Sequence, residues 1–135
     1  MNKFRFNWKK AILITFLLVS FSSKTNAKLP TTIIKNCYDG DTCTTIDGEK
    51  IRLACIDTPE LKEKKGDPIA AKDARDFLNN LVINKEVSIR RITKDRYGRT
   101  VAELFNGNIN IQKLLVDKGY GQIYKKYSNQ CEWSK

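Results

Sequence analysis

Short strand-like runs broken by turn signals constrain the fold of this 135-residue chain more than any other feature of its sequence. β-Branched and aromatic residues gather in short runs between turn residues, a pattern typical of strands. Asp47-Gly48 predicts a tight hairpin between two of these runs. The expected strands are Thr31–Cys37, Thr42–Ile46, Glu49–Leu53, Val87–Ile92 and Thr100–Phe105.

Two helices are expected around these strands. Asp67 is a good N-cap, Pro68 suits the first helical position, and apolar residues follow at helical spacing. A second helix is expected over Ile111–Lys118, capped by Asn110 and ended by Gly119. Five strands with two packed helices predict an α+β fold, a five-stranded OB-fold β-barrel.

The N-terminus has the pattern of a secretory signal peptide. Basic residues precede the apolar run Ala11–Val19, and a small-residue site ends at Ala27. The run is shorter than the roughly 20 apolar residues that span a bilayer, although an uncleaved anchor is the alternative. We expect cleavage after Ala27, which leaves residues 28–135 as one secreted or periplasmic domain. We expect that domain to be a monomer with no stable membrane association.

The charge of the chain remains positive without the signal segment. Residues 1–27 hold five basic residues and no acidic ones, so their removal lowers the formal charge from +10 to +5. A basic exported protein suits a polyanion such as nucleic acid, although adhesion to a cell surface would favour the same sign.

The four cysteines all lie beyond the signal segment. An even number of cysteines in an exported chain favours disulfides. Zinc is the weaker alternative, because the chain has no histidine and no Cys-x-x-Cys spacing. Four cysteines allow three pairings, and we favour Cys37–Cys43 across a hairpin and Cys55–Cys131 joining the tail to the barrel.

The lack of histidine limits the chemistry that the chain can perform. It excludes a histidine base, nucleophile or metal ligand, so hydrolysis would have to use carboxylates, a hard cation and arginines. Such groups gather in three segments, Asp39–Thr42, Arg52–Glu60 and Asp95–Arg99.

Together the three segments resemble the signature of the staphylococcal nuclease (thermonuclease) family, in order and spacing, along nearly all of residues 28–135. The resemblance implies an OB-fold, calcium-dependent nuclease that hydrolyses phosphodiester bonds of DNA and RNA. It also implies a preference for single-stranded or unpaired regions and products that end in 3′-phosphates.

The resemblance also assigns a Ca²⁺ site. Asp41 and Asp57 match the family's calcium-binding aspartates, and the backbone carbonyl of Thr58 matches a third ligand. Calcium takes six to eight oxygen ligands, so this set leaves room for water and a phosphate oxygen. Asp39 is expected to shape the turn or to support the metal indirectly.

Three further residues carry the expected catalysis. Glu60 resembles the glutamate that positions and deprotonates the attacking water. Arg52 and Arg99 resemble the two arginines that hold the scissile phosphate, and strand alternation sends Arg52 away from its apolar neighbours. The alternative for Arg99 is a hairpin-end arginine that only pairs with Asp95.

The remaining candidates bind the nucleotide. Arg96 and Tyr97 match family positions that contact its base and terminal phosphate, and Tyr124 and Tyr127 supply further tyrosines unless they pack in the core. One rival function is an OB-fold module that binds nucleic acid without cutting it. Another is a basic, disulfide-bonded surface protein. The complete catalytic set favours an enzyme.

Overall fold

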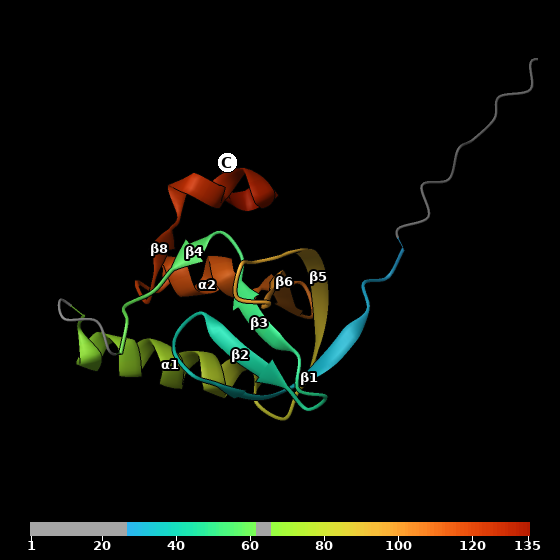
Figure 1. Ribbon diagram of the computed structural model, residues 1–135, viewed down its shortest axis with the longest axis horizontal. Helices are drawn as coiled ribbons and strands as arrows, with labels where there is room; N and C mark the ends of the chain where they lie inside the picture. The colour runs from blue at the N-terminus through green and yellow to red at the C-terminus, as the bar shows by residue number, and fades with distance from the viewer. Residues whose placement is uncertain (1–26, 62–65) are drawn as a thin grey trace, which may run out of the picture.

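A closed β-barrel forms the centre of the protein, whose computed structural model describes residues 27–61 and 66–135 (Figure 1). The strand order β3-β2-β1-β5-β6 is closed by parallel pairing of β3 with β6. This confirms the predicted five-stranded, α+β barrel. The predicted signal peptide lies outside the described residues, except for its last residue. The barrel strands are β1 (Thr31–Cys37), β2 (Thr42–Thr45), β3 (Lys50–Leu53), β5 (Glu86–Lys94) and β6 (Thr100–Asn106).

Strand β1 belongs to both sides of the barrel. Its first residues, Thr31–Ile33, pair antiparallel with β5, whereas Ile34–Cys37 pair antiparallel with β2. The register shifts between Ile34 and Asn36, and such an irregularity bends a strand. This bend lets one strand connect two differently directed parts of the sheet.

The two predicted helices are present, with the predicted caps. Helix α1 (Pro68–Val82) begins at Asp67, whose carboxylate accepts the amide of Ala70 at 3.0 Å. Helix α2 (Ile111–Asp117) begins at Asn110, whose side chain likewise accepts a backbone amide. Each helix buries an apolar face, and α1 lies at the end of the barrel opposite the C-terminal tail (Figure 1).

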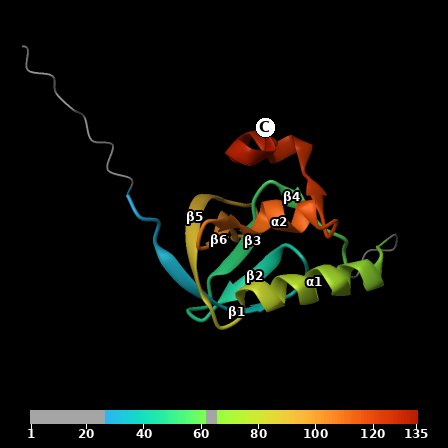
Figure 2. The same cartoon turned by 180° about the vertical axis from the view of Figure 1, so that it is seen from behind.

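The sequence did not predict several short elements. Strand β4 (Ile56–Asp57) pairs with β8 (Gln122–Ile123), and β7 (Ile109–Asn110) extends the sheet beside β6. Two 3₁₀-helices, η1 (Lys125–Gln130) and η2 (Glu132–Ser134), form the tail. Both views of the molecule place this tail above β4 (Figure 2).

Both predicted disulfide pairings are confirmed. Cys37–Cys43 joins β1 to β2 across the turn between them, and Cys55–Cys131 joins the residues after β3 to the tail. The second bond spans 76 residues of sequence. It therefore connects the barrel to a segment far along the chain.

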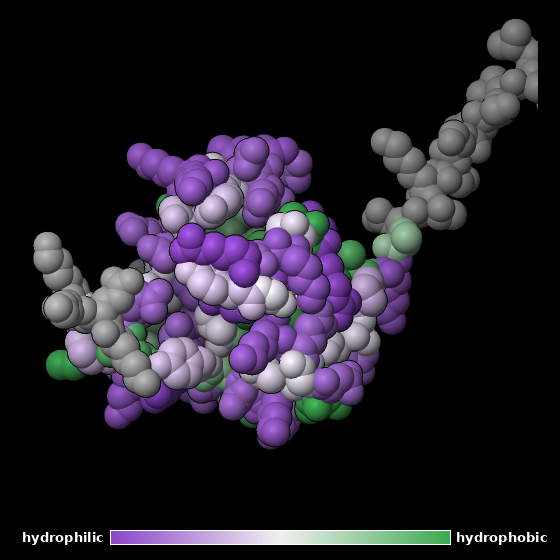
Figure 3. Space-filling model, viewed as in Figure 1, coloured by the Kyte–Doolittle hydropathy of each residue, from purple (hydrophilic) through white to green (hydrophobic). Residues whose placement is uncertain are grey.

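Hydrophilic residues cover most of the face seen in Figure 3, and hydrophobic residues form small separate spots on it. Among residues 27–61 and 66–135, the helices are too short or too polar to cross a bilayer.

Candidate active site

A cavity of about 520 Å³ opens between the turn that joins β5 to β6 and the C-terminal tail. The predicted site residues on its wall are Arg52, Arg96, Tyr97, Arg99, Tyr124 and Tyr127. The other predicted site residues, Asp41, Asp57, Thr58 and Glu60, do not line it. Asp41, Asp57 and Thr58 gather around Arg52 through the contacts given below, and Glu60 lies near enough for its charge to act on Asp41.

Arg52 lies between two acidic side chains. It stands in the middle of β3, and its Nη2 lies 3.3 Å from Asp41 Oδ2 and 3.6 Å from Asp57 Oδ1. Its Nη1 donates to the carbonyl of Leu53 at 2.6 Å. The guanidinium is thus fixed at the border between the carboxylates and the cavity.

Asp41 is a buried carboxylate with an unusual environment. Its Oδ2 accepts hydrogen bonds from the backbone amide of Thr58 at 3.1 Å and from the Thr58 hydroxyl at 2.9 Å. The pKa of Asp41 is raised to about 6, chiefly by burial. The charge of Arg52 lowers it, whereas the charges of Asp39 and Glu60 add to the rise. A nearby positive charge therefore favours the ionised form.

Carboxylate and carbonyl oxygens are the donor types that a hard cation prefers. Asp41 and Asp57 converge on the same guanidinium, and 43% of the Asp57 side chain is exposed. In the part of the chain that the structure describes, no group of three or more histidine, cysteine or acidic side chains could hold a metal. Two carboxylates and the Thr58 carbonyl would therefore need water and substrate to complete the coordination of Ca²⁺.

Two contacts hold Arg99, which also lines the cavity. Its Nε donates to Asp95 Oδ2 at 2.7 Å, and its Nη1 donates to Thr42 Oγ1 at 3.3 Å. Thr42 Oγ1 in turn donates to Asp41 Oδ1 at 3.2 Å. The hydroxyl thus links an arginine of the cavity to a predicted metal ligand. This role of Thr42 was not predicted from the sequence, although Thr42 directly follows Asp41.

Asp95 organises the turn that carries Arg99. Its Oδ1 accepts the backbone amides of Tyr97 and Arg99, both at 2.9 Å. Burial raises the pKa of Asp95, but the hydrogen bonds from Arg99 and Tyr97 outweigh burial and lower it below its ordinary value. The pairing of Arg99 with Asp95, which the sequence offered as an alternative to phosphate binding, is therefore present, and Arg99 still lines the cavity.

A second set of contacts holds the base of this turn. Lys94 Nζ donates to Thr100 Oγ1 at 2.8 Å, and Thr100 donates to Glu49 at 2.6 Å. A hydrogen bond from Arg91 lowers the pKa of Glu49 to about 2. Lys94 also lines the cavity, a position that the sequence analysis did not predict.

The aromatic residues of the cavity are exposed. Tyr97 is 66% exposed, and the guanidinium of Arg96 lies 4.7 Å from the centre of its ring. Tyr124 and Tyr127 make an edge-to-face contact, with 5.1 Å between ring centres, and both remain more than a third exposed. These rings can stack on nucleobases. Lys126 and Gln130 also line this end of the cavity, and the sequence did not point to them.

Gly40 is required by the close approach of α1. A Cβ at Gly40 would lie 2.8 Å from the Cβ of Ala74 and 2.9 Å from the Cβ of Thr58. Gly40→Ala is therefore expected to destabilise the fold by about 1–3 kcal/mol, as overpacking does. Because Thr58 holds Asp41, the substitution should also slow catalysis. Thermal unfolding and activity measurements test both effects.

Gly107 provides the matched control for this substitution. A Cβ there meets nothing within 4 Å, although the φ of +58° favours glycine. Gly107→Ala should cost only about 1 kcal/mol of backbone strain and leave activity unchanged. Equal effects on activity in the two variants would contradict the packing argument.

Known proteins with similar sequences indicate the family of this chain. A family profile described as "Staphylococcal nuclease homologue" matches residues 50–135. An "Uncharacterized endonuclease" of Haemophilus influenzae is 34% identical over 126 residues, which cover 89% of this chain and 68% of that protein. An "Uncharacterized endonuclease" of Escherichia coli O157:H7 is 32% identical over 67% of this chain and 58% of its own length. "Staphylococcal-like nuclease CAN1" of Arabidopsis thaliana is 34% identical, and the match covers 25% of it.

The closed barrel, together with the matching profile and the relatives named as endonucleases, identifies an OB-fold phosphodiester hydrolase. The matching profile covers more than half of the chain. The chain belongs to the staphylococcal nuclease family.

Proposed function

We propose that this protein is a calcium-dependent nuclease that cuts single-stranded or unpaired DNA and RNA and leaves 3′-phosphates. The observation that carries the proposal is the placement of Arg52 and Arg99 on one cavity, with Arg52 beside Asp41 and Asp57. We also propose that it acts outside the cytoplasm, as its N-terminal sequence pattern suggests.

Asp41, Asp57 and the carbonyl of Thr58 would hold the cation. When bound, Ca²⁺ would supply a positive charge that polarises a phosphate oxygen and stabilises the negative charge of the transition state. Thr58 keeps the Asp41 carboxylate oriented through two hydrogen bonds. Glu60 lies close enough to Asp41 for its charge to act there, and it would orient the attacking water and draw off its proton.

The two arginines would act on the phosphate itself. Each guanidinium can donate parallel hydrogen bonds to phosphate oxygens, and it stays charged as negative charge accumulates at phosphorus. Asp95 and Thr42 restrict the Arg99 side chain, so less freedom is lost when the phosphate binds. Attack by water then breaks the bond to the 5′ oxygen and leaves a 3′-phosphate.

The rest of the cavity would bind the nucleotide. Arg96 and Tyr97 lie on one wall, and Tyr124 and Tyr127 lie on the other. Stacking on tyrosine needs a base that is not paired in a duplex, and every base has a face that can stack. The exposed tyrosines therefore support a preference for unpaired strands and tolerance of sequence.

Cleavage of denatured DNA, with calcium and then with excess chelator, tests this function directly. We expect cutting only with calcium. Glu60→Gln should lower kcat by at least about a hundredfold, because amide replaces the base that acts on water.

Glu86→Gln is the matched control, because Glu86 is an exposed glutamate at the start of β5. The Glu86→Gln protein should cut DNA at the rate of the unaltered protein. Cutting that survives the chelator would contradict the role of the metal, and an active Glu60→Gln protein would contradict the role of Glu60. Tight binding of single-stranded DNA without any cutting would make the protein a binding module.

A further inference from the structure

Within the C-terminal tail, η1 builds one wall of the cavity without buried side chains of its own, whereas Trp133 of η2 packs against the core. Tyr124, Lys126, Tyr127 and Gln130 line the cavity, yet no residue of η1 is buried. A six-residue 3₁₀-helix with no buried side chain has little to stabilise its position. Other contacts must therefore hold this wall in place.

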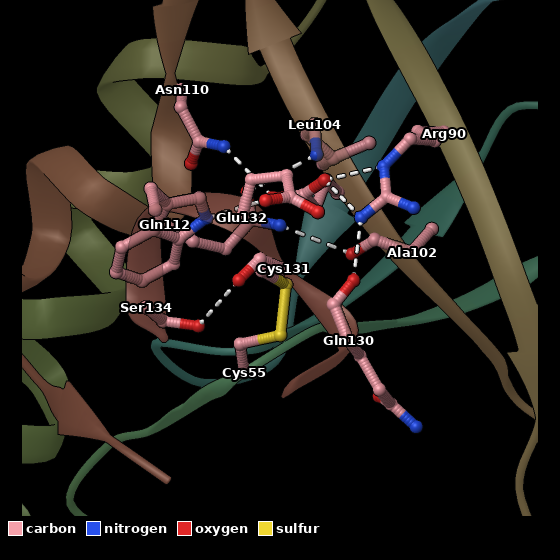
Figure 4. A network of polar contacts seen from close by, with 12 residues as sticks. Cys55, Arg90, Ala102, Leu104, Asn110, Gln112, Gln130, Cys131, Glu132 and Ser134 are labelled. Carbon is pink, nitrogen blue, oxygen red and sulfur yellow. Dashed lines mark hydrogen bonds and ion pairs between the residues drawn. A yellow bond between two sulfur atoms is a disulfide. The ribbon is translucent and has the colours of Figure 1, made fainter. Parts of the chain in front are cut away.

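Contacts at both ends of η1 join it to the rest of the protein, and the buried Ser134 hydroxyl donates to the carbonyl of Ser128 within it at 2.8 Å. At its start, the amide of Tyr124 donates to the carbonyl of Cys55 at 2.9 Å, next to the short β4–β8 pairing. At its far end, Arg90 Nη2 donates to the carbonyl of Gln130 at 2.8 Å. Cys131 follows at once and is fully buried in its bond to Cys55 (Figure 4). Cys55 therefore anchors both ends of η1.

Cys55 itself belongs to a segment that carries site residues. It follows β3, which holds Arg52, and precedes Asp57. Its φ of 67° is rarely adopted by residues other than glycine, so the surroundings must hold this conformation. The strand beside it has independent anchors, because Leu53 donates to the carbonyl of Asp41 and Ala54 to that of Ala102.

We propose that the Cys55–Cys131 disulfide is the positioning element of the substrate cavity. It holds the wall that carries Tyr124 and Tyr127 against the barrel, so affinity for nucleic acid depends on the closed bond. The chemical step does not, because Arg52, Asp41 and Arg99 are held by contacts within the barrel. This inference rests on the proposed nuclease function.

A comparison of two double variants tests the proposal. Cys37→Ser with Cys43→Ser leaves Cys55–Cys131 as the only disulfide, whereas Cys55→Ser with Cys131→Ser leaves only Cys37–Cys43. Each purified protein is assayed on a single-stranded oligonucleotide with and without dithiothreitol, which reduces the disulfide to two thiols and is itself oxidised to a cyclic disulfide. Values of kcat and KM are measured, with circular dichroism as the check of folding.

If the disulfide positions the cavity wall, its reduction should raise KM and leave kcat nearly unchanged. Reduction of the Cys37→Ser, Cys43→Ser protein should raise KM about tenfold to a hundredfold, the loss expected when one or two bases no longer stack, and change kcat by less than about threefold. The Cys55→Ser, Cys131→Ser protein should have the high KM without dithiothreitol, and dithiothreitol should not change it. An unchanged KM, or a general loss of folded structure, would overturn the proposal.

Binding separates this failure from failure of the nuclease function. The dissociation constant of the same oligonucleotide is measured by fluorescence anisotropy in chelator, so that nothing is cut. If the oxidised protein never cuts DNA, the nuclease function fails, but weaker binding on reduction would still support the positioning role. If it cuts with equal KM and equal binding in both redox states, only the positioning role fails.

Discussion

Replacing Arg99 with lysine is expected to lower kcat for DNA cleavage by about a hundredfold to a thousandfold, the usual loss when one transition-state donor is removed. The guanidinium contacts Asp95 through Nε and Thr42 through Nη1, which fixes its plane at the cavity wall. A lysine ammonium is a point charge and cannot keep both contacts while donating two parallel bonds to phosphate. Single-turnover cleavage measures the loss.

Arg75→Lys is the matched control for this prediction. Arg75 also pairs with a neighbouring aspartate, Asp76, at 2.9 Å, but it lies in α1 and does not line the cavity. That substitution should leave kcat and the melting temperature nearly unchanged, because exposed ion pairs contribute little. If Arg99→Lys cut DNA as fast as Arg75→Lys, Arg99 would be the hairpin-end arginine that its pairing with Asp95 allows.

Local sequence signals predicted the barrel because each strand ends at a recognisable turn. The bounds of β1 match the expected Thr31–Cys37, and the Asp67 and Asn110 caps begin their helices as expected. These features depend on residues close in sequence. The parallel pairing of β3 with β6 depends on distant residues, so only the count of strands and the family resemblance pointed to closure.

The parts that escaped prediction depend on contacts rather than on patterns. The two-residue strands β4 and β8 are too short to show a period, and η1 has no buried face to mark it as a helix. Thr42 was visible within Asp39–Thr42, but its link between Arg99 and Asp41 required the geometry. The sequence therefore predicted the residues that carry chemistry better than those that position them.

Glu103 is a residue important for stability whose role the sequence did not predict, because an acidic residue in β6 gives no sequence signal of being buried. It is only 3% exposed, and its carboxylate accepts hydrogen bonds from Arg90 at 2.5 Å, Asn110 at 3.0 Å and Trp133 at 2.8 Å. It thus connects the barrel to the strand before α2 and to the tail.

Glu103→Ala is expected to lower the free energy of unfolding by about 2–4 kcal/mol, because the donors of Arg90, Asn110 and Trp133 lose a buried acceptor. The outer part of Arg90 reaches solvent, which moderates the loss. Thermal unfolding should show a melting temperature lower by about 10 °C or more.

Two variants serve as controls for this prediction. Glu103→Gln keeps acceptor capacity and should lose less free energy of unfolding. Asp117→Ala, which breaks an exposed pair with Lys113, should cost under about 1 kcal/mol. Equal losses in Glu103→Ala and Asp117→Ala would mean that this buried network does not hold the tail to the barrel.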